Sequence, residues 1–142
     1  MAVHTALLRV QTEGEGQIVD LTVGLAGALR GAEVSDGVVT VFVTGSTAAV
    51  TTMEHEPGGV QDLQEAIERL VPRRRPEGGD YAHNTRNHDD NAHAHLRVAA
   101  RPVALDPARA GKPRARHLAA GGADRLRRPA ARERAVHVQV AS

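Results

Sequence analysis

Apolar and polar residues alternate along several stretches of the chain, and this period of two predicts β-strands with one buried face. Residues 3–12 alternate in this way, and so do residues 136–140, where valine alternates with polar residues. Residues 38–44 are almost all β-branched or aromatic, which favours an extended conformation. Shorter extended segments are predicted at residues 17–21 and 47–53.

A second pattern, with apolar residues three or four positions apart, predicts helices. It is clearest in residues 60–71, and Pro72 ends that helix. The apolar face of the helix is formed by Val60, Leu63, Ala66, Ile67, Leu70 and Val71. A shorter helix is predicted over residues 23–30, with Thr22 as its N-cap.

A third helix is predicted to begin near Asn91, because Asp89 and Asp90 precede it and either aspartate is a good N-cap. Strands and helices are therefore interspersed along the chain. The pattern predicts one α+β domain over residues 1–142, with a mixed or antiparallel β-sheet system and two to three helices.

Residues 97–131 follow neither period and are rich in Ala, Arg, Pro and Gly. Native sequences agree at the local and global levels, and this stretch does not. We expect it to be non-native sequence in an otherwise regular domain.

Composition narrows the classes of function. The chain has no cysteine, which excludes disulfides and cysteine-ligated zinc, and its net charge of +1 argues against nucleic-acid binding. Its first residues show no signal peptide, and no apolar run is long enough to span a bilayer, so a cytoplasmic protein without a membrane partner is expected. The excess of arginine in residues 97–134 leaves a basic nucleic-acid arm as the weaker alternative.

Candidate chemistry is concentrated in residues 81–95, which contain four histidines. Histidine titrates near neutral pH and is the commonest metal ligand, so His83 and His95 are candidate catalytic residues. His93 lies two positions from His95, and on a helix the two side chains would point in different directions, so we favour His95. Glu54, at the expected end of a strand, is the candidate general base.

Two kinds of site fit these residues. Glu54, His83 and His95 supply three ligands of the type that zinc uses, with magnesium as the other divalent candidate. The second kind of site binds an anion such as phosphate, and we slightly favour it. Its candidate residues are Ser46, Thr47, Arg86, Asn91 and His93.

Three segments together resemble a known family. They are Asp36-Gly37 with the strand and turn that follow as far as Glu54, the helix from Asp62 to Pro72, and the run from Tyr81 to Arg97 with its Asp-Asp-Asn-Ala-His-Ala-His sequence. In this order and spacing they are similar to the YjbQ family of secondary thiamine-phosphate synthases, over about residues 3–96 and 132–141.

The resemblance implies an α+β homotrimer that couples hydroxymethylpyrimidine diphosphate with a thiazole phosphate and releases pyrophosphate, as a weak side activity. It implies a small phosphorylated molecule as the substrate. The alternative is a trimeric protein that binds a ligand or anion without catalysis.

The family's later strands, with Gly-Pro-Ser and Gly-Thr-Trp-Gln sequences, are missing from the written frame. Suitable high-GC codons for residues 101–107, read one base later, give Gly-Pro-Ser-Arg-Ser-Ile-Pro. The same shift in residues 116–129 gives Gly-Thr-Trp-Gln followed by Asp-Phe-Asp-Gly-Pro. We therefore predict a local frameshift that begins near residues 97–99 and ends near residues 129–132.

Overall fold

The computed structural model describes residues 2–88, 90–99, 105–109, 112–113, 118–122 and 132–142. Its strands form two sheets in which every paired strand is antiparallel, with the orders β1-β8-β3-β5-β6 and β2-β7-β4. The strands are β1 (Val3–Thr12), β2 (Ile18–Asp20), β3 (Asp36–Val43), β4 (Ala48–Thr52), β5 (Leu105–Arg109), β6 (Lys112–Pro113), β7 (Leu118–Gly122) and β8 (Arg132–Ala141). The expected α+β class is confirmed, with antiparallel pairing.

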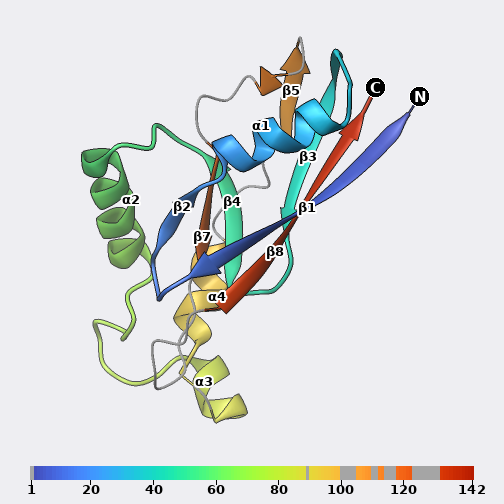
Figure 1. Ribbon diagram of the computed structural model, residues 1–142. Coiled ribbons are helices and arrows are strands. Elements are labelled where there is room, and N and C mark those ends of the chain that lie inside the picture. Colours follow the sequence, from blue (N-terminus) through green and yellow to red (C-terminus); the bar gives the residue numbers. More distant parts are fainter. Residues whose placement is uncertain (1, 89, 100–104, 110–111, 114–117, 123–131) are drawn as a thin grey trace.

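Strand β8 lies inside the larger sheet, between β1 and β3 (Figure 1). His137 of β8 is opposite Leu7 of β1 and Phe42 of β3. Strands β1 and β8 were predicted from the alternation of apolar and polar residues, and β3 from its β-branched and aromatic residues. The register places Leu8, Val41 and Val138 on the inner face of the sheet, whereas Leu7 and Phe42 are exposed on the outer face.

The core is built almost entirely from valine, leucine and alanine. Leu25 and Leu29 of helix α1 (Thr22–Gly31) are each 1% exposed and pack against the inner face of the larger sheet. Val39 and Val138 supply β-branched side chains to that face. Gly24 of α1 lies close to the sheet, because a Cβ atom there would be 3.2 Å from a methyl group of Leu8.

Three further helices are present, so the described residues contain four helices where two to three were expected. They are α2 (Pro57–Leu70), α3 (Ala82–Asn87) and α4 (Ala92–Ala99). In Figure 1, α2 stands to one side of the sheets, and α3 and α4 lie together at one end of the molecule. In the described part of the chain, no helix has the length and apolar character needed to cross a membrane.

The predicted helix caps need correction. Thr22 is the first residue of α1, and its backbone N–H donates to Asp20 Oδ1 at 2.8 Å, so Thr22 is not the N-cap. Helix α2 begins three residues earlier than expected because Glu56 is its N-cap, with Pro57 in the first turn. The first N–H of α4, from Ala92, donates to Asn84 Oδ1 at 2.9 Å.

Strands β5, β6 and β7 lie in the segment whose sequence shows no strand pattern. Residues of β5 pair with β3, and residues of β7 pair with β2 and β4. We expected the sequence as printed to lack these strands, and this is wrong, because its backbone forms β5 and β7. Antiparallel pairing uses N–H and C=O groups that every residue except proline carries, so β3 and β4 accept this segment despite its composition.

Candidate functional site

Helix α4 turns His93 and His95 to different sides of the molecule. Two residues of an α-helix are separated by about 200° around its axis. His93 is completely buried, whereas His95 is half-buried. The two histidines therefore enter different environments, as expected if this segment is helical.

The side chain of His95 contacts the turn between β3 and β4. Its Nδ1 lies 3.1 Å from the backbone oxygen of Ser46. A carbonyl oxygen only accepts hydrogen bonds, so Nδ1 carries the proton and Nε2 has the lone pair in the neutral ring. This is the orientation in which a histidine acts as a base or a ligand through Nε2.

His83 lies next to His95, with the ring centroids 5.0 Å apart and the planes tilted by 58°. It lies on α3, a helix that the sequence pattern did not predict. Its Nε2 is 3.1 Å from Oδ1 of Asn91, and its Nδ1 is 3.1 Å from Nδ2 of Asn87. The amide oxygen of Asn91 accepts from Nε2–H, which fixes the ring beside His95.

Asn84 positions this histidine pair. It was not among the site residues predicted from the sequence. It is buried, accepts from the N–H of Ala92 and donates from Nδ2 to Asp80 Oδ1 at 2.7 Å. It thereby joins α3 to the first turn of α4. Nothing in the local pattern distinguishes it from the other asparagines in this segment.

Arg134 lies behind the β3–β4 turn and was also missed. It is 8% exposed, and its Nη2 donates to Thr47 Oγ1 at 3.3 Å. Its Nη1 is 3.6 Å from the position that a Cβ atom would take on Gly45, whose φ is +105°. The sequence could have predicted its burial, because Arg134 lies two residues before Val136, on the same buried face of β8.

The other predicted site residues lie at several places. Ser46 is exposed and Thr47 is buried, and both belong to the turn that His95 contacts. Glu54 and Arg86 are exposed. Among the described residues, no hydrogen bond or ion pair joins the Glu54 carboxylate to His83 or His95, and no three His, Asp or Glu side chains are grouped to hold a metal ion.

His93 belongs to a buried ion cluster on the other side of α4. Its Nε2 lies 2.8 Å from Glu15 Oε1, and its buried Nδ1 has no hydrogen-bond partner. Arg97 also donates to Glu15, at 3.2 Å, and pairs with Glu68 of α2. The hydrogen bond from His93, together with the nearby charges of His93, Arg97 and Arg73, holds the pKa of Glu15 below its ordinary value, against the opposing effect of burial. This cluster joins α4 and α2 to the β1–β2 turn.

Comparison with known proteins identifies the family. Residues 6–104 match the sequence profile described as "UPF0047 protein YjbQ-like". The chain belongs to the YjbQ-like UPF0047 family. A UPF0047 protein of Methanothermobacter thermautotrophicus is 31% identical over 98 residues, which cover 69% of this chain and 64% of the relative. One from Archaeoglobus fulgidus is 34% identical over 91 residues, covering 64% of this chain and 65% of the relative.

These YjbQ-like sequence matches thus span somewhat less than two thirds of each curated relative. The structural matches extend much further. A YbjQ-like protein of unknown function from Sulfolobus solfataricus P2 has a TM-score of 0.80 at 25% identity, covering 98% of both chains. A hypothetical protein from Aeropyrum pernix K1 has a TM-score of 0.80 at 29% identity, covering 97% of this chain and 98% of that one.

Replacing Glu15 with glutamine should reduce stability at neutral pH by about 1–3 kcal/mol, because buried His93 and Arg97 lose a charged acceptor. The folded-state pKa of Glu15 lies below its ordinary value of 4.5. Its contribution is therefore complete above pH 4.5 and is lost as the pH falls through the lowered folded-state value. Urea unfolding from pH 7 to pH 3 should show the difference between Glu15→Gln and wild type shrinking in acid.

Glu13→Gln is the matched control, since Glu13 is an exposed carboxylate in the same turn. It should change stability by less than about 0.5 kcal/mol at every pH. An unchanged stability of Glu15→Gln at pH 7 would contradict the role given to the cluster.

Proposed function

We propose that the histidine pair at the β3–β4 turn is an active site that acts on a small phosphorylated molecule. The observation that carries the proposal is the position of His95, whose Nδ1–H is held by the Ser46 carbonyl while His83 lies 5.0 Å away, ring to ring. A fixed Nδ1 presents Nε2 for proton exchange or hydrogen bonding. Arg134, behind Thr47, places a positive charge beside the turn.

The family resemblance supports a specific reaction, the coupling of hydroxymethylpyrimidine diphosphate with a thiazole phosphate. The thiazole nitrogen forms a bond to the methylene carbon of the pyrimidine. The bond from that carbon to the diphosphate oxygen breaks, and pyrophosphate leaves with the electron pair. Negative charge develops on the departing oxygen, so hydrogen-bond donors and cations near it lower the barrier.

In this proposal the imidazolium form of His95, with a proton on each ring nitrogen, donates from Nε2 to the phosphate oxygens. His83 stays in place through Asn91 and orders the ring of His95. The turn at Ser46 and Thr47 is the proposed contact for a phosphate group, while Arg86 and Asn91 are proposed to approach it from α3 and the start of α4. His93 is fully buried on Glu15, so we leave it out of the anion site.

Glu54, His83 and His95 do not form a three-ligand group in the described structure, so they do not fit a resident zinc site. We propose magnesium as the divalent metal, entering with the diphosphate, because Mg²⁺ is usually held by substrate phosphates and few protein ligands. Among the described residues, no hydrogen bond or ion pair joins Glu54 to the histidines, and this favours the second candidate function, a protein that binds the anion without turnover.

The variant His95→Gln tests the site. With magnesium present, we expect release of pyrophosphate from the two substrates to fall by about 100-fold or more, because the acid–base group is lost. The matched control is His88→Asn, which removes an exposed histidine of the same segment whose φ of +54° asparagine tolerates. It should keep wild-type activity.

Equal activities of His95→Gln and wild type would reject the active site. Binding of hydroxymethylpyrimidine diphosphate by wild type without any pyrophosphate release would favour the non-catalytic candidate. Loss of activity in Glu54→Gln would show that Glu54 takes part in the reaction.

We also propose that residues 97–131 arise from a frameshift. Two observations support this. The match to the family profile ends at residue 104. The two structural relatives, by contrast, cover 98% and 97% of this chain. Strand β5 has Pro107 opposite Val38 in the middle of its pairing with β3, where proline cannot donate to the ladder.

Sequencing the coding DNA from Asp90 onward and weighing the denatured protein tests the frameshift. We expect one inserted and one deleted base, and a chain mass that differs from the 15.0 kDa of the written sequence. The mass should match a chain that contains tryptophan. A mass and a DNA sequence that both agree with the written frame would reject the frameshift.

A homotrimer is the proposed assembly. The outer face of the larger sheet exposes Val3, Leu7, Val38 and Phe42, each about half exposed, which is unusual for large apolar side chains on one sheet face. Native mass spectrometry should give a species of three times the chain mass. A monomer at micromolar concentration would contradict the trimer.

A further inference from the structure

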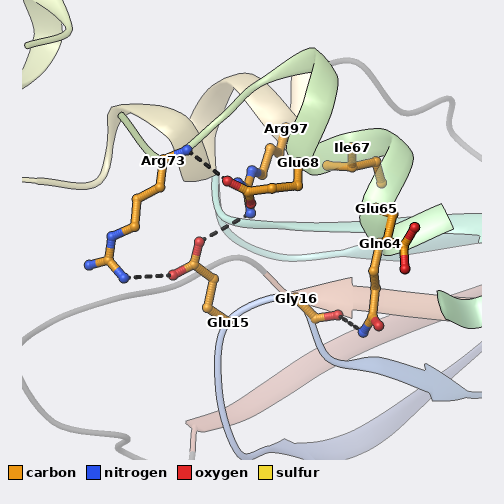
Figure 2. A pocket seen from close by; sticks show the side chains of 8 residues that line it. All are labelled: Glu15, Gly16, Gln64, Glu65, Ile67, Glu68, Arg73 and Arg97. Carbon is orange, nitrogen blue, oxygen red and sulfur yellow. Dashed lines mark hydrogen bonds and ion pairs between the residues drawn. The ribbon is translucent and has the colours of Figure 1, made fainter. Parts of the chain in front are cut away.

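A pocket of about 490 Å³ opens between α2 and the β1–β2 turn, on the side of α4 away from His95. Figure 2 shows its walls, with Glu15 and Gly16 below and the helix above. It is lined by Glu15, Gly16, Gln64, Glu65, Ile67, Glu68, Arg73 and Arg97. Pockets of this volume are typical of small-molecule sites. None of the residues proposed for the phosphorylated substrate lines it.

The space beneath α2 is hollow because the helix is held by polar contacts. No residue of α2 is buried, although its sequence has an apolar face. Gln64 Nε2 donates to the Gly16 oxygen at 2.8 Å, and Glu68 pairs with Arg97 (Figure 2). The side chains of the described residues leave this pocket open at the surface.

The two arginines of the pocket differ in what they bind. Arg97 is buried and its guanidinium donates to the Val71 oxygen, to Glu15 and to Glu68, so its donors are engaged. The side chain of Arg73 is 36% exposed, and its guanidinium lies 3.8 Å from Glu15 and 3.9 Å from Asp90. In the part of the chain described by the structure, it makes ion pairs at those distances and no hydrogen bond. Its planar fork is therefore open to an oxyanion, which it binds in bidentate geometry.

The carboxylates of the pocket also differ in whether a neighbouring cation occupies them. Glu15 and Glu68 both pair with the buried cation of Arg97. Glu65 is 54% exposed and has an amide of Gln61 at 2.8 Å and Arg69 at 4.0 Å. It retains acceptor capacity for an ammonium or N–H group. A ligand with an oxyanion alone would be repelled by these carboxylates, whereas a ligand with both groups would be complementary.

We propose that this pocket is a second ligand site, for a small molecule that carries one oxyanion and one amine. Arg73 binds the oxyanion, Glu65 accepts from the amine, and Ile67 contacts the connecting carbons. The site is separate from the histidine pair and its existence does not depend on the reaction proposed there.

Calorimetric titration of the full chain with four probes tests this site. The probes are inorganic phosphate, ethanolamine, phosphoethanolamine and 4-aminobutyl phosphate, of which the last two carry both groups at different spacings. We expect one of the two amino phosphates to bind at least about tenfold more tightly than phosphate or ethanolamine, because two charge-assisted contacts form together. Binding of both amino phosphates no more tightly than phosphate would overturn the proposal.

Variants then assign the contacts. Arg73→Met should weaken the tighter amino phosphate by about tenfold or more, and Glu65→Gln should abolish its advantage over phosphate. Arg75→Met is the matched control, because Arg75 comes from the same loop, pairs with Glu77 and does not line the pocket. It should leave the affinity unchanged, and thermal unfolding should show that all variants are folded.

An unchanged affinity in Arg73→Met, or an equal loss in Arg75→Met, would overturn the site. His95→Gln separates the two proposals. Unchanged amino phosphate binding in that variant supports a second site whatever the enzyme assay shows. Loss of binding would place the ligand at the histidine pair and overturn the second site.

Discussion

The helical pitch of α4 is the constraint on which the rest of this molecule depends. With about 100° between successive residues, one short helix sends His95 to the β3–β4 turn and His93 to the ion cluster of Glu15. Arg97, one turn after His93, extends that cluster to Glu68 of α2. Had this segment been a strand, both histidines would lie on one face, and neither the site nor the cluster would form.

The two sides of α4 place their charged and titratable groups in different electrostatic environments. On the His93 side, charged groups are buried, and each must find a partner because an unpaired buried charge is costly. Arg97 achieves this with three acceptors, so that region is rigid. On the His95 side, only one ring nitrogen is held, and the other is left for chemistry. The cluster thus gives α4 a fixed orientation from which His95 acts.

The sequence predicted the parts of the fold that local pattern controls. Strands β1 and β8 and most of helix α2 follow from the spacing of their apolar residues, and β3 follows from its β-branched and aromatic residues. The separation of His93 from His95 followed from helical geometry. The positions of Asn84 and Arg134 could not be predicted in this way, because each acts through a partner distant along the chain, Ala92 eight residues away and Thr47 eighty-seven residues away. Helix α3 was missed because six residues are too few to show a period.

The place of β8 between β1 and β3 has a consequence for how the chain acquires its structure. Strand β1 has β8 as its partner in the larger sheet, and the two are joined at Thr12 and Arg132 across 120 residues. During synthesis, β1 and β3 leave the ribosome long before the strand that must lie between them. Until β8 arrives, both present unpaired edges, which are sites of aggregation. The need of the nascent chain for chaperones should therefore depend on how quickly translation proceeds from β3 to β8.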